Sequence, residues 1–248
     1  MPLTWVKGVT AGGDKGLYML EFFSALVVFV LTHAVPARPA VRGRLVDTLG
    51  RRTYLALYSA LSLALLAWLI SAAIRAPQIV IWEQAAWQAV LALIMMPPAL
   101  ALIFAGLIAA NPLSVSFCTD GYDPARPGLL AITRHPVLWG FGLWGGVHIA
   151  ANGDLVSIIF FGAMTFFALM GTITLDRRAA RLLGETEWRR LAAGTANVPL
   201  IATVQGRARL SIDRPLLAGI AASAIVSAIL LTSGHLWLFG TDPLVFWR

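Results

Sequence analysis

The chain is poor in cysteine and in charged residues. Cys118 is the one cysteine among 248 residues, which excludes an intrachain disulfide and any CxxC metal or redox motif. Charged residues make up 12% of the chain and hydrophobic residues 58%, a composition outside the range of soluble domains. The net charge is +7, but no basic tract is interleaved with aromatics, so nucleic acid is not expected as a partner. The composition predicts a polytopic membrane protein whose surroundings are lipid.

The chain is rich in long apolar stretches. A helix needs about 20 apolar residues to cross the hydrocarbon layer of a membrane. Six stretches suit such spans: about 17–35, 54–74, 86–110, 136–151, 155–175 and 215–239. We therefore predict an all-α bundle of about six transmembrane helices, which forms a single domain over residues 1–248.

Arginines in the connecting segments predict the orientation. The connections 36–53 and 176–214 are rich in arginine, so the positive-inside rule places both on the cytoplasmic side. Residues 176–191 alternate arginines with leucines and predict an amphipathic helix lying on the cytoplasmic membrane surface.

Residues 132–154 stand out because they hold two of the four histidines. Arg134-His135-Pro136 opens the predicted fourth span, where proline suits the first helical turn. His148 lies near its end and has Trp144 and Gly145 on its own face, so these two would flank anything that His148 binds. His135 and His148 are thirteen positions apart, about 20 Å along a helix, and cannot share one small site.

Histidines within membrane spans are functional candidates because polar groups are costly in lipid. His33 and His148 each lie near the end of a span, and two imidazoles from different helices can hold a b-type haem. A hydrogen-bonded pair, or two unrelated histidines, is the alternative. A zinc site is not expected, since neither histidine has a carboxylate or thiol at i±3 or i±4. His235, next to Leu236 and Trp237, is expected at the membrane interface.

Several motifs together resemble the NnrU family of integral membrane proteins. The matching residues are Thr133-Arg134-His135-Pro136, Leu143 to His148, Ala151 to Asp154, His33, Pro36, Pro39, Arg42, Leu49-Gly50, Tyr54, Leu57-Tyr58-Ser59, Asp176-Arg177-Arg178 and Trp188. The family resembles cis-zeta-carotene isomerases that bind haem b in the membrane, and its bacterial members are linked to denitrification, the respiration of nitrite and nitric oxide. The resemblance implies a haem b protein of the bacterial inner membrane, with respiratory or denitrification proteins as partners.

The resemblance also implies site residues. It assigns His33 and His148 as the haem ligands. Trp144 and Gly145, on the helix face of His148, and Arg134 with His135, at the start of the span, are further cofactor-binding candidates from their positions. Membrane depth alone would make His135 the better partner for His33, and the sequence leaves this choice open. The isomerases have a cysteine three residues before the second histidine, where this chain has Gly145, so a switch to a thiolate ligand is not expected here.

The sequence is compatible with three other functions. Isomerisation of a polyene such as zeta-carotene would use an apolar cavity that accepts a hydrophobic small molecule. A methyltransferase that uses S-adenosylmethionine is the second, because Arg134-His135-Pro136 with residues 182–188 and Pro199 is similar to the cofactor-binding end of isoprenylcysteine and phospholipid methyltransferases. A non-catalytic subunit of a respiratory complex is the third. The sequence specifies neither the substrate nor the redox partner, the oligomeric state or whether turnover occurs.

Overall fold

The computed structural model describes residues 15–35 and 39–248, and every regular element in that part of the chain is a helix. Contacts divide the chain into two compact units. The first unit comprises the residues up to Ile81 together with Asp154–Val156, and the second comprises Trp82–Gly153 and Ser157–Arg248.

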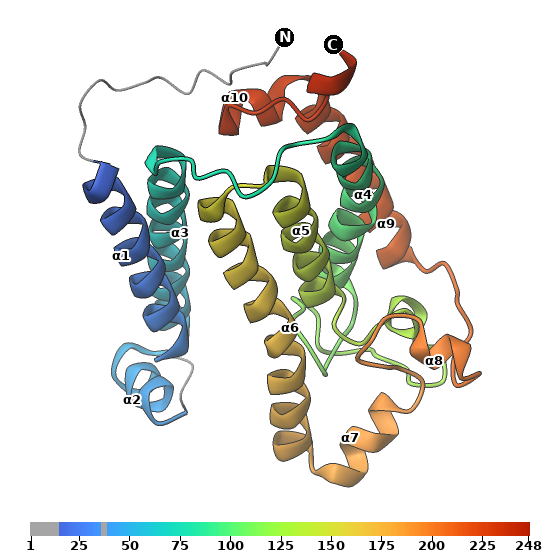
Figure 1. The fold of residues 1–248 in the computed structure, drawn as a ribbon. Helices are drawn as coiled ribbons and strands as arrows, with labels where there is room; N and C mark the ends of the chain where they lie inside the picture. Colours follow the sequence, from blue (N-terminus) through green and yellow to red (C-terminus); the bar gives the residue numbers. More distant parts are fainter. Residues whose placement is uncertain (1–14, 36–38) are drawn as a thin grey trace. The chain divides into compact units, whose positions relative to one another are not determined.

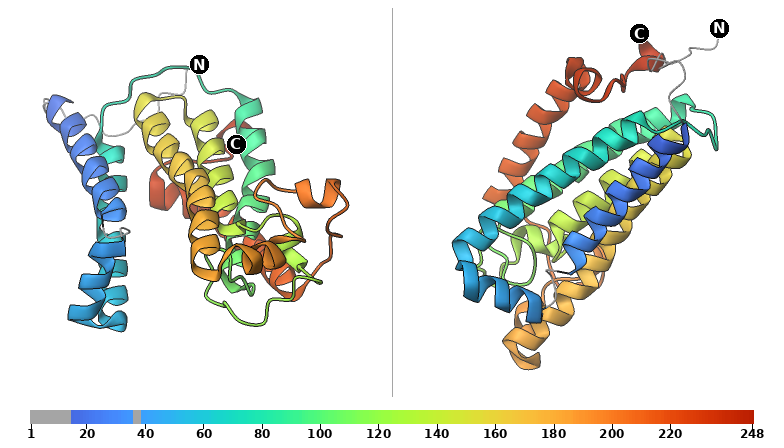
Figure 2. Two further views of the ribbon diagram at one scale, coloured as in Figure 1. Left: turned by 90° about the horizontal axis from the view of Figure 1, so that it is seen from below. Right: turned by 90° about the vertical axis from the view of Figure 1, so that its left-hand side faces the viewer.

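The first unit is built on two long helices, α1 (Lys15–Ala34) and α3 (Arg51–Arg75), joined through α2 (Pro39–Leu49). Figures 1 and 2 show α1 and α3 packed side by side. Polar contacts join the two helices: the Glu21 carboxylate pairs with the Arg75 guanidinium and accepts a hydrogen bond of 3.1 Å from Trp68 Nε1. Two opposite charges on neighbouring helices compensate each other, which lowers the cost of placing them near lipid.

The second unit is organised around α4 (Ala86–Ile108), which packs against both α5 (Pro136–Asn152) and α9 (Arg214–Ile229) (Figure 1). Small residues allow this close packing. A Cβ atom at Gly140 would lie 2.6 Å from the Ala99 carbonyl oxygen of α4, and one at Gly219 would lie 2.7 Å from the Ala101 carbonyl oxygen. Helix α4 is therefore held on two sides by backbones that approach it directly.

The remaining helices of the second unit follow α5 in the chain. They are α6 (Leu155–Leu183), α7 (Glu185–Ala192), α8 (Ile201–Val204), the π-helical turn η2 (Leu230–Gly234), α10 (His235–Phe239) and the 3₁₀ turn η3 (Val245–Trp247). A second 3₁₀ turn, η1 (Gly128–Ala131), precedes α5. Asp213 caps α9: its carboxylate accepts hydrogen bonds from the backbone N–H of Leu216 (2.9 Å) and of Leu129 (2.7 Å). One side chain thereby joins η1 to the start of α9.

The membrane character of the chain is confirmed. Within the described residues, five helices are long and apolar enough to span a bilayer: Lys15–Ala34, Arg51–Arg75, Ala86–Ile108, Leu155–Leu183 and the continuous segment Arg214–Phe239. Large apolar side chains such as Leu63 and Phe166 are more than half exposed on these helices, as expected where the surroundings are lipid. The remaining predicted span, the fourth, forms α5, which at 17 residues is shorter than the other five.

One predicted element is wrong in its boundaries. Residues 176–191 do not form a separate surface helix, because α6 continues without a break to Leu183. Gly184, with φ 81°, ends it, and only α7 is a distinct helix after the turn. The left-handed backbone at Gly184 costs glycine little, which is why the helix breaks there.

Candidate functional site

The histidines occupy different environments. His33 lies in α1 of the first unit, while His135, His148 and His235 belong to the second unit. The surroundings of His33 are thus formed within the first unit, and those of the other three histidines within the second.

His33 presents a defined tautomer. Its Nδ1 lies 2.7 Å from the Phe29 carbonyl oxygen one turn earlier in α1. A carbonyl oxygen only accepts, so Nδ1 carries the proton and Nε2 of the neutral ring keeps its lone pair. The imidazole lies 4.1 Å from the Phe29 ring and 5.8 Å from the Tyr58 ring, centroid to centroid. Nε2 is thus the atom of His33 that a metal would take.

His148 repeats this arrangement on α5. Its Nδ1 donates to the Trp144 carbonyl oxygen at 2.7 Å, again one turn earlier. Its ring lies 5.2 Å from the Trp144 ring and 4.6 Å from the Phe161 ring, with planes 27° apart in the second pair. Proteins orient a metal-binding imidazole by a hydrogen bond from its other ring nitrogen, the one that does not bind the metal, to an acceptor such as a carbonyl oxygen. In His33 and in His148 alike, Nδ1 is bound to a carbonyl oxygen and Nε2 is the nitrogen left for another partner.

The two neighbours of His148 face different ways. Trp144 flanks the His148 ring and also contacts Phe161 at 5.1 Å between centroids. Gly145 instead packs against α6, where a Cβ atom would meet Thr165 Oγ1 and would lie 3.0 Å from the Phe161 carbonyl oxygen. A cysteine at this position would collide with α6, so α5 has no room for the thiolate of the isomerase pattern.

His135 is fully buried and has both ring nitrogens engaged. Nε2 donates to Asp176 Oδ1 at 3.1 Å, and Nδ1 lies 2.8 Å from Ser114 Oγ. Asp176 lies in α6, so these bonds fix the first turn of α5 against that helix. A ligand role for His135 would require one of these bonds to break, whereas His148 has Nε2 without a hydrogen bond from any described residue.

Arg134 completes this buried cluster. Its Nε lies 3.5 Å from Asp176 Oδ1, and its guanidinium carbon lies 5.3 Å from the centre of the Trp188 ring in α7. Burial lowers the pKa of Arg134, and the nearby Asp176 carboxylate acts against this shift. Asn111 Nδ2 donates to the Arg134 carbonyl oxygen at 2.9 Å. The Arg-His-Pro turn is therefore bonded inward to protein groups.

Tyr122 lies close to the same cluster and gives a pH prediction. Its hydroxyl donates to the Leu191 carbonyl oxygen at 3.1 Å, and burial raises its pKa from 10.0 to about 12. Because the folded state favours the neutral phenol, the stabilisation from Tyr122 is complete below pH 10 and is lost as the pH rises through about 12. Ultraviolet titration of the wild type minus Tyr122→Phe should give one ionisation near pH 12. Ionisation near pH 10 would contradict this.

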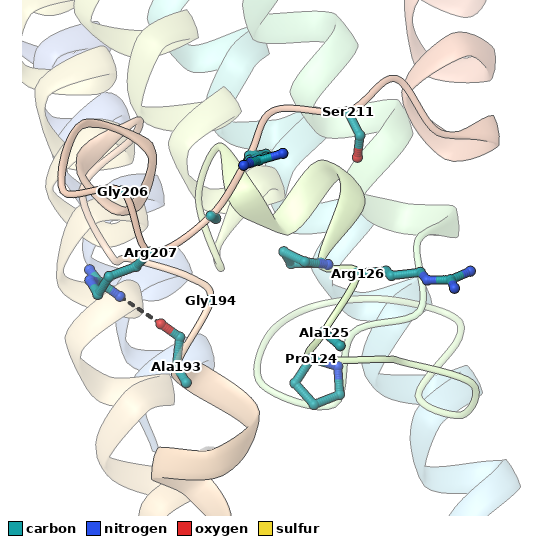
Figure 3. A pocket seen from close by; sticks show the side chains of 11 residues that line it. Pro124, Ala125, Arg126, Ala193, Gly194, Gly206, Arg207 and Ser211 are labelled. Atoms are coloured by element: carbon teal, nitrogen blue, oxygen red, sulfur yellow. Dashed lines mark hydrogen bonds between the residues drawn. The ribbon is translucent and has the colours of Figure 1, made fainter.

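A surface pocket of about 820 Å³ lies between the segments 124–127, 193–194 and 206–211, and its lining includes Arg126, Arg207 and Arg209. Figure 3 shows the Arg207 side chain turned toward the Ala193 carbonyl oxygen, which accepts its hydrogen bond at 2.8 Å, while Arg126 extends away on the other side. The arginines do not converge on one point. The pocket is therefore positively charged, but its arginines are not arranged to bind one anion together.

Sequence reasoning missed three residues that the structure brings to these sites. Ser114 and Asp176 engage His135, although both lie far from it in the chain. His235 lies beside His148, with ring centroids 6.4 Å apart and planes 21° apart. His235 and Asp176 could have been noticed as a histidine and an acidic residue near membrane spans. No local sequence pattern, however, pairs His235 with His148 or Asp176 with His135.

Comparison with known proteins gives one result. No curated protein and no solved structure matches the chain. The model of the family described as NnrU protein matches residues 21–243, which is almost the whole chain and includes both units. The chain therefore belongs to the NnrU protein family.

Proposed function

We propose that this chain is an integral membrane protein of the bacterial inner membrane that binds haem b and acts in denitrification. The observation that carries the haem proposal is the matched state of His33 and His148. In each, the Nδ1–H group donates a hydrogen bond of 2.7 Å to a carbonyl oxygen, which leaves the lone pair of Nε2 for a metal. Neutral imidazole with this orientation is the ligand form that haem iron takes.

The surroundings of His148 support the proposal of a porphyrin rather than a bare metal ion. Among residues 15–35 and 39–248, no three His, Cys, Asp or Glu side chains group into a metal site. Haem iron needs only two protein ligands, because the porphyrin supplies four nitrogens. The flat rings of Trp144 and Phe161 beside His148 offer apolar packing for a macrocycle.

When bound, haem b would supply an iron that binds small ligands or carries an electron. The residues of this chain would do the rest. His148 and His33 would hold the iron through Nε2, the Trp144 and Phe29 carbonyl oxygens would keep each imidazole in the right tautomer, and the surrounding aromatic rings would exclude water. The part in nitrite and nitric oxide respiration, and partners among denitrification proteins, rest on family membership.

The test is the visible spectrum of the detergent-solubilised protein from haem-replete cells. Wild type is expected to copurify with a Soret band. His148→Gly removes a ligand without adding a side chain, so the haem content should fall severalfold, and added imidazole should restore the spectrum by filling the space. Rescue separates loss of a ligand from loss of the fold. Colourless wild-type protein would refute the proposal.

A further inference from the structure

The segment between α7 and α9 exposes large apolar side chains. It comprises residues 193–213, belongs to the second unit and contains one short helix, α8. Its most exposed aliphatic side chains are Val204 (81%), Leu210 (55%) and Ile212 (72%), and Val198, Leu200 and Ile201 are exposed as well. A group of exposed apolar side chains in one segment marks a contact with a partner or with a membrane.

The same segment is basic, and its arginines have no acidic partner. Arg207 and Arg209 lie within it and Arg214 follows it, whereas its one acidic residue, Asp213, is engaged as the cap of α9. None of these arginines forms an ion pair with a described residue, and the same holds for the exposed Arg126. The segment thus presents free positive charge together with apolar surface.

The segment ends where a membrane span begins. Residues Arg214–Phe239 are long and apolar enough to cross a bilayer. Ile212 is two residues before Arg214, so even an extended chain keeps it within about 7 Å of the span, roughly the thickness of the headgroup layer on one side of a bilayer. The exposed Leu210 and Ile212 therefore lie next to lipid rather than in bulk water.

The positively charged pocket opens beside this segment. Residues 206–209 and Ser211 line it together with 124–127 and 193–194. Figure 3 shows Arg126 and Arg207 on different sides of the pocket, and Asp123, the acidic residue nearest to Arg126 in the chain, forms no ion pair with it. Separate arginines of this kind suit a membrane surface, where each can bind a different headgroup phosphate.

We propose that residues 198–214, with Arg126 beside them, form a membrane-surface segment that binds anionic phospholipids. The exposed aliphatic side chains enter the outer part of the acyl layer, and the arginines bind headgroup phosphates. A free anion gives the apolar side chains no partner, and a neutral lipid leaves the arginines without one, so both features favour the same occupant. The surface segment of this chain then lies after α7, and the proposal does not depend on haem binding.

The first test measures the depth of nitroxide labels in the full chain, reconstituted in nanodiscs that contain phosphatidylglycerol. Leu210→Cys and Ile212→Cys are labelled separately in Cys118→Ser protein, and Glu185→Cys, at a side chain 57% exposed on α7, is the control. The labels at 210 and 212 should collide more with oxygen, which dissolves in the acyl layer, than with a water-soluble nickel complex. The label at 185 should show the reverse.

Labels at 210 and 212 that are as open to the nickel complex as the label at 185 would overturn the proposal. The exposed apolar side chains would then face water and would be free for a soluble partner instead of lipid.

The second test titrates short-chain phosphatidylglycerol into the detergent-solubilised protein and follows binding by native mass spectrometry. An arginine near an anionic surface contributes a factor of about five, so Arg126→Gln with Arg209→Gln should weaken binding about tenfold or more. Arg189→Gln with Arg190→Gln removes the same charge from exposed ion pairs on α7 and should change the affinity less than twofold. Short-chain phosphatidylcholine should bind wild type more weakly than phosphatidylglycerol.

Three results of this titration would contradict the proposal. Equal losses in the two double variants would show that net charge, not this segment, attracts the lipid. Equal affinity for phosphatidylcholine would remove the role of the arginines. Displacement of phosphatidylglycerol by an equal concentration of inorganic phosphate would make the occupant a free anion.

Discussion

Replacing Asp176 with asparagine should lower the free energy of unfolding by about 3–5 kcal/mol, the cost of leaving a buried charge without its partner. The side chains of Arg134 and Asp176 are only 12% and 18% exposed, so solvent screens the pair little. The asparagine would keep the shape and an acceptor for His135 Nε2, but the Arg134 guanidinium would stay buried beside a neutral group. Urea or thermal unfolding of the detergent-solubilised protein measures the effect.

The control for this prediction is an ion pair on α7. Glu185 and Arg189 lie 2.7 Å apart, one helical turn from each other, with side chains 57% and 73% exposed. Exposed pairs of this kind contribute little because water competes for both charges. Glu185→Gln should therefore leave the unfolding transition almost unchanged. Equal losses of unfolding free energy in Asp176→Asn and Glu185→Gln would show that burial does not determine how much the Arg134–Asp176 pair contributes to stability.

Gly140→Ala should destabilise the second unit by about 1–3 kcal/mol or more, the usual cost of forcing extra volume into a packed interface. The added Cβ would lie 2.6 Å from both the Ala99 carbonyl oxygen and Ile103 Cγ1. Backbone oxygens cannot turn aside as a flexible side chain can, so α4 and α5 would have to separate. The melting temperature should fall, and under the proposed function the haem content should fall with it, because α5 carries His148.

Gly146 is the matched control on the same helix. A Cβ atom there would meet nothing within 4 Å. Gly146→Ala should therefore gain up to about 1 kcal/mol from the better helix propensity of alanine. If both variants shifted the melting temperature in the same direction, packing between α4 and α5 would not be the cause.

The helices were predictable because the hydropathy of a spanning segment is a local property. The predicted spans 17–35 and 136–151 agree closely with α1 and α5. The prediction for 176–191 failed for an equally physical reason. Arginines after Asp176 look like a surface segment, yet nothing in residues 176–183 stops a helix that is already formed, and Gly184 is the first residue that does.

The site was less predictable because its contacts join distant residues. The family resemblance assigned His33 and His148, and the structure adds the tautomer of each, which depends on a carbonyl one turn away. The partners of His135 lie 21 and 41 positions from it, beyond the reach of any periodic pattern. The position of His235 depends on a π-turn that leaves no clear mark in the residues 230–234.

The length of α6 places the buried charges at a particular depth. Its 29 residues extend about 44 Å, whereas the hydrocarbon core of a bilayer is about 30 Å thick. With Leu155 at one edge of the hydrocarbon core, Asp176 lies about 32 Å along the helix, at the opposite edge. Arg134 and Asp176 can therefore meet without either charge crossing the oily interior during insertion.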